Sequence, residues 1–226
     1  MKSWTVYENG FNNKNIVNNG NKFMTGNGYM GLRGTMEEYT KNELVACNIS
    51  GLYDKQGDSW REPINAPNGL FTTFSINGEE VSLLQANPLK HVQSLDINEG
   101  IHRRNTTWNT IHGEINLKSE RFVSLVNSHL ICLKYTLTVN QNCELIIKTG
   151  IDGDVWDING FHLENYKVEN INELIKVSSR TQELKVPVVV TEVCIRKFES
   201  KEVIEKGEKS IFRNIKFKAE PKVEYT

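Results

Sequence analysis

The sequence lacks the features that mark secreted, membrane-spanning and nucleic-acid-binding proteins. No run of about 18 apolar residues occurs, so we expect no transmembrane helix. The 27 lysines and arginines nearly balance the 28 aspartates and glutamates, and the net charge of −1 gives no reason to expect a nucleic-acid or membrane partner. No apolar segment follows the first four residues, so the sequence predicts no signal peptide.

Cysteine is also scarce, and its spacing is uninformative. The four cysteines, Cys47, Cys132, Cys143 and Cys194, contain no C-x-x-C pair. This pattern predicts free thiols in a reducing, cytoplasmic compartment, without a disulfide framework or a metal site. The 38% hydrophobic content suffices for one substantial core, and no repeat or linker divides the chain. We therefore expect residues 1–226 to form a single domain.

Period-two alternation of apolar residues dominates the chain and predicts an all-β fold. The inward positions of the clearest runs are Ile115, Leu117, Ser119, Arg121, Val123 and Leu125; Ile131, Leu133, Tyr135, Leu137 and Val139; and Ile211, Arg213, Ile215 and Phe217. Arginine takes an inward position in two of these runs. An inward arginine must be paired or must border a cavity.

Together with the remaining segments, these strands predict a large antiparallel two-sheet β-sandwich. Residues 70–76 predict a strand that ends in a hairpin turn at Asn77-Gly78. Residues 140–142 separate two more strands. The β-branched run 186–195 predicts a strand buried on both faces, with Pro187 near its start. Residues 164–179 are interpreted as strand and turn, and no helix is predicted.

A glycine-rich segment, FMTGNGYMGLRGTMEE over residues 23–38, is the most informative part of the chain. It contains the dinucleotide-binding pattern G-x-G-x-x-G at Gly26, Gly28 and Gly31. That pattern requires an apolar strand before it and an amphipathic helix after it. Here an asparagine-rich segment precedes it and no periodic apolar face follows. We therefore expect a glycine-rich strand that another backbone approaches closely.

The same segment resembles the opening signature of the N-terminal domain of family 65 glycoside hydrolases, which include maltose, trehalose, kojibiose and nigerose phosphorylases. Further similar segments follow in the family's order at residues 51–54, 66–68, 76–79, 94–96, 119–125 and 150–155. The residues matched to the family signature are Gly26, Asn27, Gly28, Tyr29, Gly31, Arg33, Gly34, Glu37, Glu120, Arg121, Asp152 and Asp154.

The resemblance implies a super-sandwich similar to that of galactose mutarotase. It also implies that catalysis belongs to a helical barrel absent from these 226 residues. The chain is then the non-catalytic N-terminal domain of an inverting α-glucoside phosphorylase. Such a domain packs on the barrel, shapes the active-site rim through residues 54–68 or 153–161, and supports a homodimer. The disaccharide and inorganic phosphate are substrates of the parent enzyme, and the domain itself needs no cofactor.

Two other functions stay open from the residues themselves. An independent carbohydrate-binding module would stack sugars on exposed aromatics, for which the candidates are Trp60, Trp156 and Phe161. A mutarotase-like enzyme would need a histidine and a glutamate in hydrogen-bond reach of one substrate. The candidates for that pair are His102, His129 or His162 with Glu114 or Glu120.

Two arginines and three aspartates are expected to stabilise the fold and not to bind a ligand. Arg33 and Arg121 are expected to be buried ions paired with Glu37, Glu38 or Glu120. Asp152, Asp154 and Asp157 resemble a calcium-binding loop, but Trp156 occupies the place of a ligand and the terminal glutamate is missing. We therefore expect a turn in which the aspartates cap backbone amides.

Overall fold

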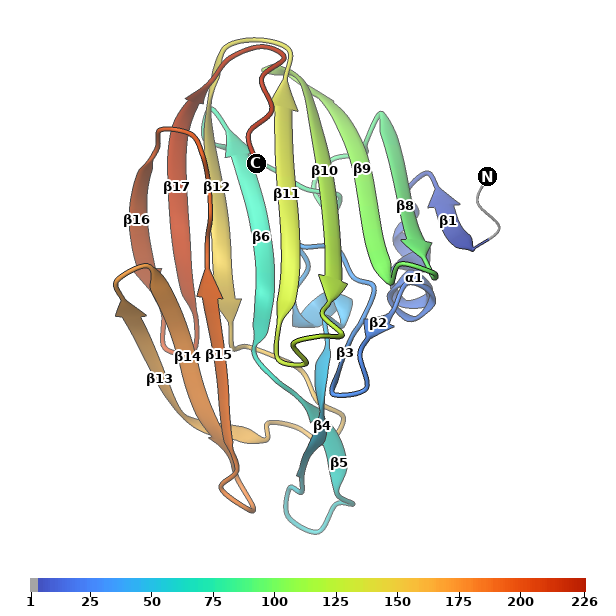
Figure 1. The fold of residues 1–226 in the computed structure, drawn as a ribbon, viewed down its shortest axis with the longest axis vertical. Coiled ribbons are helices and arrows are strands. Elements are labelled where there is room, and N and C mark those ends of the chain that lie inside the picture. Colours follow the sequence, from blue (N-terminus) through green and yellow to red (C-terminus); the bar gives the residue numbers. More distant parts are fainter. Residues whose placement is uncertain (1–3) are drawn as a thin grey trace.

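The computed structural model describes residues 4–226, which form 17 β-strands and one short α-helix (Figure 1). Neighbouring strands are antiparallel in all four sheets. The prediction of an all-β chain with antiparallel sheets is confirmed, although the strands are divided among four sheets instead of two. No helix within residues 4–226 has the length and apolar character needed to cross a membrane.

Two five-stranded sheets form most of the molecule. The first has the order β1 (Thr5–Asn9), β8 (Lys90–Asp96), β9 (Ile101–Thr110), β10 (Gly113–Val123) and β11 (Ile131–Val139). The second has the order β16 (Lys201–Lys206), β17 (Ile211–Ala219), β12 (Cys143–Asp152), β6 (Asn68–Ile76) and β7 (Glu79–Val81).

Two smaller sheets and the helical segments complete the fold. The third sheet consists of β13 (Leu163–Ile171), β14 (Leu174–Thr181) and β15 (Pro187–Val193). The fourth consists of β2 (Thr25–Gly26), β3 (Met30–Leu32), β4 (Cys47–Asp54) and β5 (Glu62–Asn65). The helical segments are the 3-10 turns η1 (Asn13–Asn15) and η2 (Lys41–Glu43) and the helix α1 (Ile16–Lys22). Figure 1 shows the β4–β5 hairpin projecting at the lower end, near the β14–β15 turn.

The main hydrophobic core is shared by the two five-stranded sheets. It includes Trp108, Ile115, Leu117 and Leu137 from the first sheet and Phe74, Leu145, Ile215 and Phe217 from the second. The rings of Phe74 and Trp108 lie 5.7 Å apart. Because these residues alternate along their strands with polar ones, each sheet turns one apolar face toward this core.

Most strand predictions are confirmed. All the predicted inward residues of β10 and β17 are buried, and Arg213 is paired as required, because its Nε and Nη1 lie 2.9 and 2.8 Å from Glu192 and Glu202. Asn77 and Gly78 have positive φ and join β6 to β7. The alternation fails at Leu125, which is 82% exposed because β10 ends at Val123.

Two local predictions are wrong. The helix α1 forms in the asparagine-rich segment, where propensity alone gives no helix. Its last turn is closed by Phe23 N–H, which donates to Asn19 O. Strand β15 is not buried on both faces, since Val189 and Val193 are 55% and 53% exposed. It is an edge strand of the three-stranded sheet, and only its other face meets the core.

Candidate functional site

The family-signature segment forms the β2–β3 hairpin, whose turn is held by Asn27. Asn27 Oδ1 accepts hydrogen bonds from the backbone N–H groups of Tyr29 and Met30, at 3.0 and 2.9 Å. Its Nδ2 donates to Ser124 O and Ser128 O, at 2.7 and 3.0 Å. Asn27 therefore fixes both its own turn and the β10–β11 loop. The expected close backbone approach is present, because a Cβ at Gly26 would lie 2.9 Å from Met30 O.

Arg33 is not an ion-pair partner of Glu37, Glu38 or Glu120, which corrects the sequence prediction. Its guanidinium donates to Val17 O at 2.7 Å, to Leu44 O at 3.0 Å and to Asn21 Oδ1 at 3.2 Å. These acceptors belong to helix α1 and to the segment before β4. Arg33 thus holds the helix that the sequence did not predict, through the Val17 carbonyl and the Asn21 side chain.

Glu37 and Glu38 enter a fully buried ion network beneath the first sheet. Arg104 Nη1 lies 3.0 Å from Glu37 Oε2, and Arg104 Nη2 donates to Glu38 Oε1 at 2.8 Å. Ser119 Oγ donates to Glu37 Oε1 at 2.8 Å, and Arg121 Nη1 lies 3.9 Å from the same oxygen. The pairing of Arg121 with Glu37 is therefore confirmed.

Opposing effects set the ionisation of this network. Burial acts to raise the pKa of Glu37, but the charges of Arg104 and Arg121 and the Ser119 hydrogen bond outweigh it and lower that pKa. Burial acts to lower the pKa of Arg104, but Glu38 and Glu37 raise it. The two groups are consequently charged at neutral pH. Their role is to hold the signature segment against β9 and β10.

Three aspartates on the β12–β13 connection have structural partners. Asp152 Oδ1 accepts from Asp154 N–H at 3.0 Å, and Asp157 Oδ1 accepts from Asn65 N–H at 2.8 Å. Asp154 instead forms an ion pair with Lys41 at 2.8 Å. The prediction of aspartates that cap backbone amides is confirmed for Asp152 and Asp157. No group of three metal-binding side chains is present among residues 4–226.

Asp157 makes folding depend on pH in a direction that can be measured. Burial raises its pKa from 3.8 to about 6, so the folded state holds this proton more tightly than the unfolded state. Its contribution to stability therefore falls as the pH rises from about 4 to about 6. Asp157→Asn keeps an acceptor for Asn65 N–H. We expect it to raise the free energy of unfolding at pH 7 by about 1–3 kcal/mol.

Urea denaturation of both proteins at pH 4.5 and pH 7 measures this effect. The gain of Asp157→Asn over the wild type should be larger at pH 7. Asp154→Asn is the matched control, because the Asp154 side chain is about half exposed and its ion pair contributes less than about 1 kcal/mol. A gain that is the same at both pH values would contradict the assigned titration.

The aromatic candidates divide into exposed and anchored side chains. Trp60, on the β4–β5 hairpin, is 57% exposed, and Phe161 is 56% exposed. The Lys209 Nζ lies 5.0 Å from the centre of the Phe161 ring. Trp156 is half-buried, and its Nε1 donates to Val45 O at 2.8 Å. Trp60 and Phe161 are therefore largely exposed to solvent, whereas Trp156 joins the β12–β13 connection to the segment before β4.

His162 links the two predicted rim segments, residues 54–68 and 153–161. Its Nδ1 lies 3.1 Å from Asp54 Oδ2 and its Nε2 lies 2.7 Å from Glu62 Oε1. All three side chains are fully buried. The carboxylates occupy the end of β4 and the start of β5, directly across the hairpin from each other. His162 is a catalytic candidate by sequence, and no sequence pattern predicts its contacts with Asp54 and Glu62.

Among residues 4–226, none of the candidate histidines bonds to Glu114 or Glu120, and His162 pairs with the buried Glu62 instead. His102 is buried on the core side of β9, and its ring nitrogens have no hydrogen-bond partner. Glu120 points to the opposite face of the sheet, where it accepts from Arg103 Nε at 2.9 Å. The ring of His129 packs against that of Tyr29 in a tilted arrangement, with centroids 4.3 Å apart. Burial, with the charges of Arg121 and Arg104, lowers the pKa of His102 well below its usual value and keeps the ring neutral.

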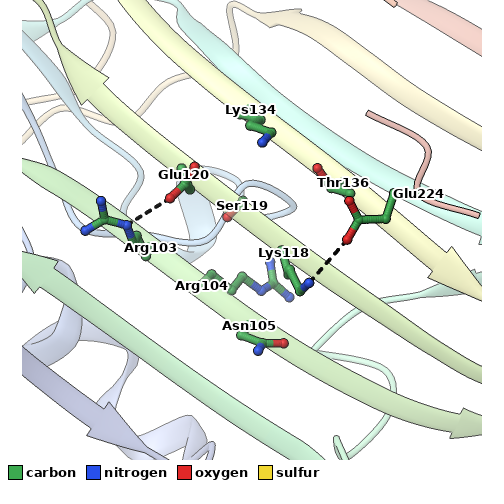
Figure 2. Close-up of a pocket in the computed structure, with 9 residues that line it drawn as sticks. All are labelled: Arg103, Arg104, Asn105, Lys118, Ser119, Glu120, Lys134, Thr136 and Glu224. Carbon is green, nitrogen blue, oxygen red and sulfur yellow. Dashed lines mark hydrogen bonds and ion pairs between the residues drawn. The ribbon is translucent and has the colours of Figure 1, made fainter. Parts of the chain in front are cut away.

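A polar groove of about 320 Å³ lies on the outer face of β9, β10 and β11 (Figure 2). Two of its cations are paired with its own carboxylates. Arg103 bonds to Glu120, and Lys118 Nζ lies 3.4 Å from Glu224 Oε1. The residues that line it are Arg103, Arg104, Asn105, Lys118, Ser119, Glu120, Lys134, Thr136 and Glu224. No aromatic ring is among them, so the groove does not provide a stacking surface for a sugar.

Arg104 is the main structural residue that the sequence reasoning missed, although a signal was available. His102, Arg104, Thr106 and Trp108 alternate along β9 and are all buried. The rule that an inward arginine must be paired, which correctly applied to Arg121 and Arg213, would have identified Arg104 as well.

The structure is thus an all-β module of antiparallel sheets, with buried structural ions and an exposed aromatic side chain on the β4–β5 hairpin. The family model for the glycosyl hydrolase family 65, N-terminal domain, matches residues 6–226. A nigerose phosphorylase from Lachnoclostridium phytofermentans is 37% identical over 249 residues and is matched by 99% of this chain. A kojibiose phosphorylase from Halothermothrix orenii is 34% identical over 156 residues, which covers 68% of this chain.

A solved structure agrees on the fold. A protein from the human microbiome, itself only provisionally assigned as a kojibiose phosphorylase, matches 98% of this chain with a TM-score of 0.87 at 16% identity. The chain belongs to glycosyl hydrolase family 65, as its N-terminal domain. The match covers 33% of the nigerose phosphorylase, 20% of the kojibiose phosphorylase and 31% of the solved structure. The chain thus spans about a third or less of these relatives.

Proposed function

We propose that this chain is the non-catalytic N-terminal domain of a cytoplasmic, inverting α-glucoside phosphorylase. The observation that carries the proposal is the family match over residues 6–226, together with relatives named as nigerose, kojibiose and trehalose phosphorylases. In the parent enzyme this domain is a single β-sandwich of the two large sheets. It packs on a catalytic helical barrel and supports a homodimer. Inorganic phosphate and a disaccharide are substrates of the parent, and the domain uses no cofactor.

Exposed apolar side chains support a docking role for one end of the domain. The β4–β5 hairpin and the β14–β15 turn lie at the lower end of the molecule in Figure 1, and the β10–β11 loop lies above the hairpin. Large hydrophobic side chains are exposed on these loops and on the adjoining β12–β13 connection: Tyr53, Trp60, Leu125, Val126, Ile158, Phe161 and Leu184. Exposed apolar surface of this kind is typical of an interaction site. We assign this end to the contact with the catalytic region, with Trp60 and Phe161 at the active-site rim.

An assay of the full-length protein tests the proposed activity. We expect cleavage of nigerose, kojibiose or trehalose that requires inorganic phosphate and yields glucose 1-phosphate, measured by enzyme-coupled detection of that product. Residues 1–226 alone are the control and should give no turnover. Phosphate-independent hydrolysis by the full-length protein, or turnover by the isolated chain, would contradict the proposal.

The rim assignment makes a separate prediction for Trp60. Trp60→Ala in the full-length enzyme should raise the KM for the disaccharide about 3- to 10-fold with little change in kcat, because an apolar contact with the sugar is lost. Trp4→Ala is the matched control, since Trp4 is 62% exposed and precedes β1, away from the hairpin. Equal effects of the two substitutions would argue against a rim position for Trp60.

The exposed aromatics also favour a second candidate, an independent carbohydrate-binding module. Trp60 and Phe161 are 57% and 56% exposed, although Lys209 Nζ lies over the Phe161 ring at 5.0 Å. Calorimetric titration of residues 1–226 with glucose, nigerose and kojibiose separates the two functions. Binding by the isolated chain supports the module, whereas no heat at millimolar sugar leaves the phosphorylase domain as the function.

A further inference from the structure

The base of the β4–β5 hairpin is held by three fully buried ionisable side chains. His162 lies between Asp54 and Glu62, with a ring nitrogen 3.1 Å from the first carboxylate and the other 2.7 Å from the second. The two carboxylates begin and end the loop that carries Trp60. The position of this exposed ring relative to the domain therefore depends on what fixes Asp54 and Glu62.

Few side chains could replace His162 between these two carboxyl groups. Both ring nitrogens of His162 face a carboxyl oxygen, so each contact requires one hydrogen. An imidazolium between two carboxylates supplies two hydrogens, and so does a neutral ring with one protonated carboxyl group. Either form satisfies both contacts away from water. A side chain that makes only one of these two contacts leaves a buried carboxyl group without its side-chain partner, which destabilises the fold.

Backbone groups from two other segments converge on the same carboxylates. The N–H groups of Gln182 and Glu183, in the β14–β15 turn, donate to Asp54 at 3.2 and 2.9 Å. The N–H of Asn159, in the β12–β13 connection, donates to Glu62 Oε1 at 2.8 Å. The hairpin, the connection that carries Phe161 and the β14–β15 turn are therefore joined through one buried cluster.

We propose that His162 is a positioning residue, which fixes the β4–β5 hairpin and the β12–β13 connection so that Trp60 and Phe161 contact the sugar bound by the parent enzyme. The contact with sugar rests on the proposed function, whereas the role of His162 in fixing the hairpin does not. His162 is buried and contacts no substrate itself. It acts through the hairpin, and its loss should loosen the three joined segments together while leaving the large sheets unchanged.

Hydrogen exchange and kinetics of the full-length protein test this proposal. In His162→Gln, exchange in residues 55–61, 153–161 and 182–186 should accelerate about 10-fold or more, with the β9 and β10 amides unchanged. The KM for the disaccharide should rise about 3- to 10-fold with kcat nearly unchanged. His112→Gln is the matched control. His112 also lies near a carboxylate, 3.5 Å from Glu79, but it belongs to the distant β9–β10 turn.

A mutant cycle separates positioning from general stability. If His162 acts through the two exposed rings, adding His162→Gln to a variant that carries both Trp60→Ala and Phe161→Ala should change its KM by less than about 2-fold. Fully additive KM effects, or unchanged exchange in the three segments, would overturn the proposal. Should His162→Gln fail to fold, Glu62→Gln takes its place, since it keeps an acceptor for Asn159 N–H. Absence of phosphorolysis in the wild type would instead refute the proposed function, and the exchange result would still decide whether His162 holds the hairpin.

Discussion

Arg104→Met is expected to lower the free energy of unfolding by about 3–5 kcal/mol, because it leaves Glu37 and Glu38 buried without their shared cation. Methionine fills much of the volume of the arginine stem, so the loss reports mainly on charge. Arg121 remains 3.9 Å from Glu37 and only partly replaces the missing interaction. Urea denaturation at pH 7 measures the change as a lower midpoint with an unchanged slope.

The preceding residue provides the matched control for Arg104. Arg103 lies on the exposed face of the same strand, where it pairs with Glu99 and Glu120, each at 2.9 Å. Arg103→Met should cost less than about 1 kcal/mol, as surface ion pairs do. The stability lost in Arg104→Met should also be smaller at pH 5 than at pH 7. Without Arg104, the buried carboxylates of Glu37 and Glu38 bind protons more tightly in the folded state than in the unfolded state, so protonation at pH 5 stabilises the variant. Similar losses in the two variants would show that burial of the network contributes nothing.

Gly34→Ala should have the second large effect. A Cβ at Gly34 would lie 2.5 Å from Phe23 Cβ and 2.6–2.7 Å from the backbone C and O of the same residue. Phe23 is fully buried and its N–H is bonded to Asn19 O, while Gly34 N–H is bonded to Gly20 O at 2.7 Å. Neither backbone can move away without breaking these bonds. We expect a loss of about 2–4 kcal/mol, at or above the upper range for overpacking.

Gly31→Ala tests whether that loss is specific to the close approach. Gly31 belongs to the same family signature, a methyl group added to it would meet no atom within 4 Å, and it does not require positive φ. Alanine should therefore change stability by less than about 1 kcal/mol, with a stabilising contribution from the less flexible unfolded chain. Thermal denaturation of both variants compares them directly. Comparable losses of stability in the two variants would show that the clash with Phe23 is not the cause of the loss in Gly34→Ala.

The strands show how far periodicity alone can predict this fold. Alternation in β10 and β17 correctly identified the buried faces, including the inward arginines Arg121 and Arg213, because each strand carries its own pattern of burial. The same reasoning failed for residues 186–195. A β-branched run has the same composition at a sheet edge as in a sheet centre, and only the neighbours decide how many faces are covered.

The charged residues show the limit of sequence reasoning for the site. The sequence indicated that Arg33 and Arg121 needed partners, but not that Arg33 would bond to helix α1 and to the segment before β4. Asp54 and His162 are separated by 108 positions in the chain, and no spacing rule connects them. A buried contact between distant residues depends on how the sheets are stacked, which local propensity does not encode.

Local patterns in the chain were enough to predict the all-β character, most strands and turns, and membership of the family, since these depend on alternation, on turn residues and on a contiguous signature. Packing between distant segments was needed to form the short helix α1, to select the partner of each buried ion, and to join the hairpin, the β12–β13 connection and the β14–β15 turn through His162. These features arise from interactions between segments far apart in the chain, whose stability depends on being buried together.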